Sequence, residues 1–500
     1  MVQKDTTITP ANASTLLTLD SLAVQRFVDS MVKDSTVAAG IINFYNSRNY
    51  QYAWFNEEGL TEQAEAFWTQ SRIYAQSNPD SNGRDDLFHA AMDSLVNGDT
   101  ATSSNEMGHI ELSLTYDFFR YIDPSSSGNI DPETAKWYIP AKKVDPATAL
   151  DSFLTGRKGN WRPLGQAFYR LRNKLQSYSA LLKAGGWPVL DIKEKSLKKG
   201  IKGADIEKIR KRLQFSGDLS PADTSTVFDI ALEQAIKRMQ KSFGLAPSGV
   251  VDHQLLEELN VPVEERIKQM LINLQRMKWM PIEDTEYILA NIPEYRLQVF
   301  QHDSIQLAMR IVVGRAANHT VIFSDRLKYI VFSPYWNIPS SIVRNEILPA
   351  IKKDKSYLAR HHMEITGHSN GLPLIRQKPG SDNALGKVKF LFPNRFNIYF
   401  HDTPARHLFD KHQRAFSHGC IRLQNPFGLA KLLLTGVPGW NDKEILQAMN
   451  RSRETWVTLE KPVPVYIVYF TSWVDKEGLL HFAKDIYGHD RVMATHLFKG

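Results

Sequence analysis

The 500-residue sequence is nearly devoid of cysteine, and Cys420 is its single example. One cysteine excludes an internal disulfide framework. No CxxC pair is present, and the nearby His401, His407, His412 and His418 do not have the spacing of a recognised zinc site. A lone cysteine is usually a small buried hydrophobe, so Cys420 by itself is weak evidence for catalysis. The sequence predicts no metal site.

Long hydrophobic runs are also missing. No stretch of 18 or more apolar residues occurs, and residues 1–10 (MVQKDTTITP) are polar, so we expect neither a membrane span nor a signal peptide in this sequence. The net charge of +7 comes from basic residues interleaved with acidic ones, which does not indicate a nucleic-acid-binding surface. The hydrophobic content of 42% is that of a globular protein, and 500 residues suggest about three domains.

Residues 396–423 (FNIYFHDTPARHLFDKHQRAFSHGCIRL) carry the strongest chemical signal. The alternating aromatic residues at 396–400 predict a strand that leads into His401, 19 positions before Cys420. A thiol attacks as its thiolate, and imidazole is the side chain best suited to remove its proton near neutral pH. Gly419 lets the backbone approach a substrate carbonyl, and consecutive N–H groups there could hold an oxyanion. The stretch predicts a cysteine acyl-transfer site.

The pattern HDT at 401–403, followed by SHGCIRL at 417–423, resembles the signature of L,D-transpeptidases with a YkuD-type catalytic domain. The resemblance implies that Cys420 is the nucleophile and His401 its base. It also implies that the backbone carbonyl of Asp402 orients the imidazole ring, and that neither a metal nor an organic cofactor takes part. His418 and Gly419 complete the set of catalytic residues that we predict, with His418 in a supporting role.

Four residues near the nucleophile are predicted to bind substrate: Tyr399, Asp402, Ser417 and Arg422. Arg422 has two interpretations, because a guanidinium could bind a substrate carboxylate bidentately or could hold the loop through a local ion pair.

Residues 20–195 are predicted to form a helical domain. Val24, Phe27 and Val28 lie on one helical stripe. The aromatic run at 49–55 could be taken for a ligand platform, but packing between helices is the simpler interpretation. The segment resembles the scaffold domain of the large YcbB-like L,D-transpeptidases.

Residues 200–262 are predicted to form a three-helix module. Ile206, Ile209 and Leu213 mark its first amphipathic helix. Gly244 is expected to end the second helix. The module resembles the type-1 peptidoglycan-binding domain, and the alternative is a spacer bundle that binds nothing.

Residues 263–500 are predicted to form the catalytic domain. Apolar side chains at every second position of 305–313 indicate a half-buried strand, and a mixed β-sandwich is expected. An insertion at about 336–386 interrupts the strands and is a candidate lid. Similar proteins have a substrate-capping subdomain there. In it, Trp336 and Asn383 are candidate substrate-binding residues, although Trp336 is expected to pack within the lid rather than to touch substrate directly.

Together these resemblances predict a multidomain α+β enzyme that forms 3–3 crosslinks in peptidoglycan through a thioester between Cys420 and a tetrapeptide donor. The expected partners are peptidoglycan stem peptides, carbapenem inhibitors and other cell-wall enzymes, with no nucleic acid. The expected location is the periplasm or cell envelope, a leader or membrane anchor having been removed. The alternatives are an L,D-carboxypeptidase that uses water as acceptor, an enzyme that attaches a protein to the wall, and a wall-binding scaffold without catalysis.

Overall fold

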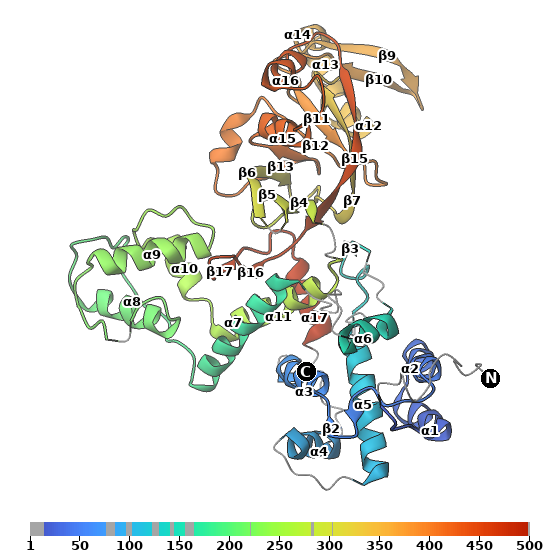
Figure 1. Ribbon diagram of the computed structural model, residues 1–500. Coiled ribbons are helices and arrows are strands. Elements are labelled where there is room, and N and C mark those ends of the chain that lie inside the picture. The colour runs from blue at the N-terminus through green and yellow to red at the C-terminus, as the bar shows by residue number, and fades with distance from the viewer. Residues whose placement is uncertain are drawn as a thin grey trace. The chain divides into compact units, whose positions relative to one another are not determined.

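The computed structural model describes residues 15–76, 86–96, 103–122, 130–140, 145–155, 165–220, 222–281, 285–302 and 304–498. These residues form two compact units (Figure 1). The first unit contains the described residues of 1–129, 141–184 and 274–282, and the second contains those of 130–140, 185–273 and 283–500. No helix in the described part of the chain is both long enough and apolar enough to cross a membrane.

The first unit is helical, as predicted. Three of its helices begin behind an aspartate, Asp20, Asp34 or Asp145, whose carboxylate accepts a hydrogen bond from a first-turn N–H group. Its elements are α1 Ser21–Met31, α2 Ser35–Ser47, β1 Phe55–Asn56, β2 Gly59–Leu60, α3 Glu62–Gln76, α4 Asp86–Val96, α5 Ser104–Ile122, α6 Pro146–Leu154 and α7 Gln166–Lys183.

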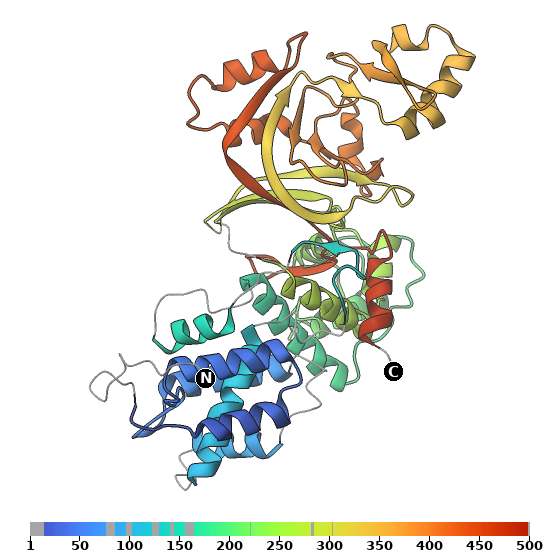
Figure 2. The ribbon, with the colours of Figure 1, turned by 90° about the vertical axis from the view of Figure 1, so that its right-hand side faces the viewer.

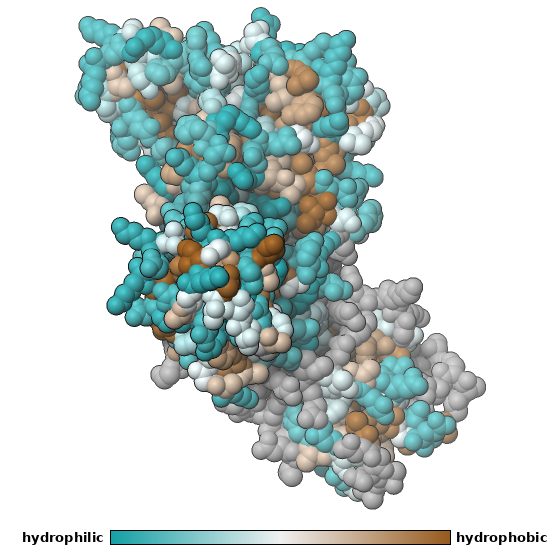
Figure 3. All heavy atoms as spheres, turned by 90° about the vertical axis from the view of Figure 1, so that its left-hand side faces the viewer, coloured by the Kyte–Doolittle hydropathy of each residue, from teal (hydrophilic) through white to brown (hydrophobic). Residues whose placement is uncertain are grey.

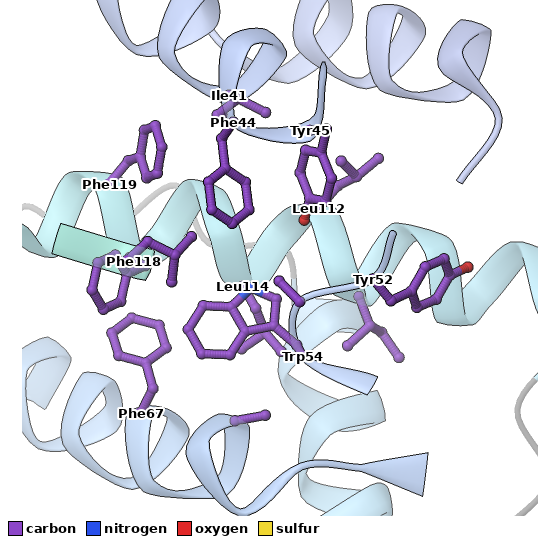
Figure 4. Packing of buried hydrophobic residues seen from close by; sticks show 14 of the residues in the cluster. Ile41, Phe44, Tyr45, Tyr52, Trp54, Phe67, Leu112, Leu114, Phe118 and Phe119 are labelled. Carbon is purple, nitrogen blue, oxygen red and sulfur yellow. The ribbon is translucent and has the colours of Figure 1, made fainter. Parts of the chain in front are cut away.

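Aromatic side chains fill the core of this unit (Figure 4). The Trp54 ring is fully buried and stacks on Phe67 at 5.4 Å between centroids, and Phe118 of α5 lies 5.1 Å from Phe67. The prediction that the aromatic run at 49–55 packs between helices is therefore confirmed.

A buried carboxylate, that of Glu111 on α5, joins segments of this core by hydrogen bonds. It accepts hydrogen bonds from the backbone N–H groups of Ala53 (2.6 Å) and Trp54 (3.0 Å) and from the Tyr45 hydroxyl (2.8 Å). Burial raises the pKa of Glu111 to about 7, even though these hydrogen bonds favour the charged form.

The second unit begins with helices α8 Ala204–Phe215, α9 Ile230–Ser242, α10 His253–Leu259 and α11 Val263–Lys278, and the last residues of α11 count with the first unit. Ile206, Ile209 and Leu213 are buried, which confirms the predicted apolar stripe of α8. The helix α9 ends at Ser242, and Gly244 follows with a φ of 66° in the left-handed region, so the predicted cap is also confirmed. The face that carries these helices is mainly hydrophilic, with small apolar patches (Figure 3).

A mixed sheet forms the core of the second unit. Its order is β11-β12-β14-β6-β5-β4-β15-β7-β3, and β11 also pairs with β7, so the strands from β11 to β7 form a closed ring. The pairs β12–β14 and β4–β15 are parallel, in agreement with the mixed strand directions of the predicted β-sandwich, although the strands form one closed ring. Figure 2 shows β7 and β15 as long curved strands. The bounds are β3 Trp137–Tyr138, β4 Glu286–Asn291, β5 Arg296–Gln301, β6 Ser304–Gly314, β7 Ile322–Phe332, β11 Val388–Leu391, β12 Phe400–His401, β13 Ala415–Ser417, β14 Ile421–Leu423 and β15 Thr455–Val468.

The chain around the sheet adds further helices and a hairpin. These are the 3₁₀-helix η3 Arg406–Asp410, α15 Pro426–Leu433, α16 Asp442–Ala448, β16 Ser472–Val474, β17 Leu480–Phe482 and α17 His489–Leu497.

The predicted strand at 396–400 is mostly wrong, since only Phe400 and His401 form β12. Asn394 is the reason. Its side-chain oxygen accepts hydrogen bonds from the N–H groups of Phe396 (3.0 Å) and Ile398 (3.3 Å), which gives the backbone an alternative to a strand ladder. A positive φ of 56° at Asn397 completes the turn.

The insertion predicted at 336–386 folds as a small subdomain, which we call the capping subdomain. It contains β8 Trp336–Asn337, α12 Ser340–Ile342, the π-helical turn η2 Val343–Ile347, α13 Leu348–Lys353, α14 Tyr357–Arg360, β9 Met363–Ser369 and β10 Leu372–Gln377. The strand β10 pairs with both β8 and β9, and helix residues such as Val343 and Ile347 cover Ile375 in a small core. The π-helical turn ends two residues before Pro349, which lacks the N–H group that a regular helix would use there.

Candidate active site

Strands β12 and β14 bring the predicted nucleophile and base together. They pair in parallel, with Phe400 opposite Ile421 and His401 opposite Arg422. Phe400 and Ile421 are fully buried. Because successive side chains of a strand point to opposite faces, His401 and Arg422 share the other face. Cys420 directly precedes β14, and both Cys420 and His401 lie close enough to Arg422 to be affected by its charge. Arg422 is thus near two residues that are 19 positions apart in sequence.

Tyr399 joins this group. The Ile421 N–H donates to the Tyr399 carbonyl (3.2 Å), and the Tyr399 ring lies 5.8 Å from the His401 ring between centroids. Burial and the neighbouring Cys420 raise the pKa of the Tyr399 hydroxyl well above its ordinary value. The hydroxyl is therefore a permanent hydrogen-bond donor beside the thiol.

The His401 ring is buried, with only 5% of the residue exposed. Its Nδ1 atom lies 2.5 Å from the carbonyl oxygen of Asp402, so Nδ1–H donates there and Nε2 is left as the acceptor. Burial lowers the pKa of His401 to about 3, and the charge of Arg422 acts in the same direction. The imidazole is therefore neutral near pH 7, with Nε2 unprotonated. The Asp402 carbonyl occupies the position that the sequence predicts.

The Cys420 side chain is partly exposed, and its Sγ atom lies 3.7 Å from the carbonyl oxygen of Asn397. Burial raises the pKa of the thiol to about 11, and hydrogen bonds from Tyr399 together with the charge of Arg422 offset this only in part. At neutral pH the site thus holds a neutral thiol and a neutral imidazole. Attack by Cys420 consequently requires a base that acts during the reaction.

The Arg422 guanidinium is a positive charge of the site that no carboxylate of the described residues neutralises. It makes no ion pair within the described residues, and its buried Nε atom has no hydrogen-bond partner there. Burial lowers its pKa, and the adjacent Cys420 acts in the opposite direction. Of the two interpretations of Arg422, the local ion pair is not found in the described part of the chain. A positive group on this face is suited to a carboxylate.

The nucleophile loop, residues 417–420, differs from the prediction at Gly419. The N–H group of Gly419 donates to the Ser417 hydroxyl (3.1 Å), which itself donates to the Cys420 carbonyl (2.6 Å). Gly419 is therefore not free to bind an oxyanion in this conformation. Among the described residues, no hydrogen bond occupies the N–H groups of His418 or Cys420, so these two are the available donors. Gly419 still needs to be glycine, because its φ is 118°.

Asp402 and Asn383 hold backbone segments in place. The Asp402 carboxylate accepts hydrogen bonds from the Lys387 N–H (2.9 Å) and from Arg406 (3.3 Å). Asn383 is 1% exposed and donates to the Pro334 carbonyl (3.0 Å). It also donates to the carbonyl of residue 378 and accepts from the N–H of residue 385. Both side chains are occupied by contacts within the protein.

Trp336 and His418 connect the site to the capping subdomain. Trp336 packs against the small core of that subdomain, in agreement with the expectation that it packs within the lid. His418 Nε2 lies 3.0 Å from a carboxylate oxygen of Glu346, on η2, and 3.5 Å from the guanidinium of Arg315. The pair between His418 and Glu346 links the nucleophile loop to the subdomain.

Sequence reasoning missed Glu346, Arg315 and Thr320. Their importance depends on contacts between segments far apart in sequence, and no local pattern indicates such contacts. In the described part of the chain, no three His, Cys, Asp or Glu side chains gather as a metal-binding group.

Three parts of the chain match known protein families. Residues 285–440 match the YkuD family, described as the L,D-transpeptidase catalytic domain. Residues 39–184 match the family described as "Scaffold domain". Residues 202–259 match the family described as "Putative peptidoglycan binding domain". These matches confirm the three resemblances noted from the sequence.

Similar individual proteins carry related names. A Haemophilus influenzae protein named "Putative L,D-transpeptidase" is 31% identical over 244 residues, which are 46% of this chain and 49% of that protein. The chain therefore spans about half the length of the curated relative that it matches.

Solved structures show weaker likeness. An L,D-transpeptidase from Mycobacterium smegmatis is 13% identical, with a TM-score of 0.20 over 37% of this chain and 58% of that chain. L,D-transpeptidase 3 from Mycobacterium tuberculosis, in complex with a faropenem-derived adduct, is 14% identical, with a TM-score of 0.20 over 37% of this chain and 60% of that chain. These scores are too low to compare the structures in detail.

Proposed function

We propose that this chain, which carries a YkuD-type L,D-transpeptidase catalytic domain, a scaffold domain and a peptidoglycan-binding domain, forms 3–3 crosslinks in peptidoglycan. One observation above all supports the proposal. His401 and Arg422 share one face of the pair β12–β14, Cys420 precedes β14 and lies near Arg422, and the Asp402 carbonyl fixes the ring of His401. This arrangement offers a nucleophile, a base and a cation for a substrate carboxylate.

The first step would be acylation of Cys420 by a tetrapeptide stem. The Cys420 sulfur attacks the carbonyl at the L-centre of the third residue, a diamino acid, while His401 Nε2 takes the thiol proton. The N–H groups of His418 and Cys420 stabilise the oxyanion, an effect worth about 3 kcal/mol per donor in well-placed cases. The C–N bond then breaks, D-alanine leaves with the proton from His401, and a thioester remains.

The second step would transfer the acyl group to an amine. The side-chain amine of the diamino acid in a neighbouring stem attacks the thioester, and His401 takes a proton from that amine. The C–S bond breaks, the thiolate regains a proton, and a 3–3 crosslink has formed. Arg422 holds a carboxylate of the substrate during these steps through charge-assisted hydrogen bonds.

The proposed partners and place follow from this activity. The substrates are peptidoglycan stem peptides, and carbapenems, whose strained carbonyl accepts the same attack, are inhibitors. In this proposal the peptidoglycan-binding domain holds the polymer near the site, and the proposed location is the periplasm or cell envelope. Other cell-wall enzymes are further candidate partners.

Muropeptide analysis tests the proposal. The protein is incubated with purified disaccharide-tetrapeptide beside Cys420→Ala, His401→Ala and a matched control, His407→Ala, which removes an exposed histidine. We expect 3–3 dimers from the wild type and His407→Ala, none from Cys420→Ala, and far fewer from His401→Ala. Tripeptide without dimers would instead establish water as the acceptor and a carboxypeptidase. No product and no carbapenem adduct would favour the scaffold alternative.

A further inference from the structure

Residues 315–320, in the connection from β6 to β7, hold two carbonyl groups of the nucleophile loop. The Arg315 N–H donates to the Ser417 carbonyl (3.0 Å), and the Thr320 hydroxyl donates to the Gly419 carbonyl (2.8 Å). A third carbonyl of the loop, that of Cys420, accepts from the Ser417 hydroxyl (2.6 Å). Two carbonyl groups of the loop are thus held by residues 315–320, and a third is held by Ser417 within the loop.

Holding a carbonyl also aims the N–H group of the same peptide unit. A trans peptide is planar, and its C=O and N–H bonds point in opposite directions. Since Thr320 holds the Gly419 carbonyl, the Cys420 N–H must point away from Thr320. In the same way, the hold of Arg315 on the Ser417 carbonyl directs the His418 N–H away from residues 315–320. These are the two N–H groups of the loop without a hydrogen-bond partner among the described residues.

The Thr320 side chain is itself fixed. The residue is fully buried, and its hydroxyl oxygen accepts a hydrogen bond from the Gly314 N–H (2.9 Å). The Thr320 N–H donates to the Tyr487 hydroxyl (3.3 Å), which donates to the Gly314 carbonyl (2.6 Å). A Cβ atom on Gly314 would lie 2.0 Å from the Asn318 carbonyl oxygen, so only glycine allows this close packing. The hydroxyl of Thr320 therefore has one donor direction left, toward Gly419.

We propose that Thr320 is a positioning residue that aims the Cys420 N–H at the oxyanion formed during acyl transfer, by holding the Gly419 carbonyl. The inference rests on the proposed function, because only attack on a carbonyl creates this oxyanion. The φ of 118° at Gly419 lets the peptide unit take the orientation that Thr320 requires. Tyr487 supports the same arrangement from the C-terminal part of the chain.

Two reactions of the same thiol separate this role from a merely structural one. Alkylation of Cys420 by iodoacetamide forms no oxyanion, whereas acylation by imipenem does. Thr320→Val keeps the shape of the side chain and removes the hydroxyl, and Thr320→Ser keeps the hydroxyl.

Loss of an oxyanion donor costs about 100-fold to 1,000-fold in rate, so we expect Thr320→Val, which only releases the donor, to slow acylation about 10-fold or more. Alkylation should stay within about 2-fold, a change too small to reflect altered thiol chemistry. Thr320→Ser should retain both rates.

Equal acylation rates for Thr320→Val and the wild type would overturn the inference, as would an equal fall in both reactions. Thermal unfolding checks that Thr320→Val folds. If it does not, Tyr487→Phe, which removes only the hydroxyl contacts of that ring, decides: slower acylation with unchanged alkylation supports the inference, and unchanged acylation overturns it. A wild-type protein that is alkylated but is acylated by neither imipenem nor tetrapeptide would refute the proposed function and this inference together. A result with Thr320→Val that overturns this inference, while the wild type is still acylated, leaves the proposed function intact.

Discussion

Replacing Gly386 with alanine should damage the site through Asp402. Gly386 has a φ of 63°, and a Cβ atom there would lie 2.4 Å from a carboxylate oxygen of Asp402 and 2.5 Å from its Cβ. Asp402 would have to move, and its carbonyl orients the ring of His401. Gly371, in the turn between β9 and β10, is a matched control, because its φ is 75° and nothing lies within 4 Å of the Cβ position.

The two substitutions share one cost and differ in another. A non-glycine residue in the left-handed region costs roughly 1–2 kcal/mol, partly offset by about 0.4–1 kcal/mol from the stiffer unfolded chain. Gly371→Ala should therefore lose about 1 kcal/mol. Gly386→Ala also disrupts the hydrogen bond from the Lys387 N–H to the Asp402 carboxylate, and bonds to charged groups are worth about 1.5–3 kcal/mol. We expect a total loss of about 2.5–4 kcal/mol for Gly386→Ala. A displaced His401 should also slow acylation about 100-fold.

Two measurements are needed. Urea unfolding followed by far-ultraviolet circular dichroism reports the stability of each variant, and mass spectrometry of imipenem adducts at the single cysteine reports the acylation rate. Equal stability losses in the two variants, within about 0.5 kcal/mol, together with equal acylation rates, would refute the reasoning, because loss of the bond to Asp402 should separate them by about 1.5–3 kcal/mol.

Three further predictions concern charge and buried polar groups. Because the pKa of Cys420 is about 11, its alkylation rate should rise about tenfold per pH unit from pH 6 to 10, and a plateau below pH 9 would contradict this. Glu111 has a folded-state pKa of about 7 against an ordinary 4.5, so it stabilises the first unit below pH 4.5 and this contribution is lost as pH rises through 7. Urea unfolding should show a loss of roughly 3 kcal/mol across that range in the wild type and a flatter profile in Glu111→Gln, and equal profiles would refute the assignment. Asn383→Ala leaves two backbone carbonyls unpaired and should destabilise the capping subdomain by roughly 2–4 kcal/mol, seen as faster limited proteolysis there. A raised KM with unchanged proteolysis would instead indicate contact with substrate.

Local patterns predicted much of this molecule. Apolar periodicity located the buried stripe of α8, and Gly244 marked the end of α9, because both effects depend on neighbours within a few residues. The resemblance to L,D-transpeptidases implied the Asp402 carbonyl as the partner of His401, and the structure has this contact.

Other features depend on tertiary structure or on competing local bonds. The aromatic alternation at 396–400 looked like a strand, but the side chain of Asn394 captures the backbone there and makes a turn. The Gly419 N–H is occupied by Ser417, which spacing alone does not indicate. The contacts of His418 with Glu346 and of Thr320 with Gly419 join distant segments, and only the folded sheet brings them together.

The most direct test is to find which atom carries the acyl group. The wild type and Cys420→Ala are mixed briefly with disaccharide-tetrapeptide, quenched in acid, weighed as intact proteins and then digested for peptide mapping. The account predicts a wild-type adduct that has lost D-alanine and maps to Cys420, and none in the variant. An adduct on another residue, or crosslinked product from Cys420→Ala, would contradict it.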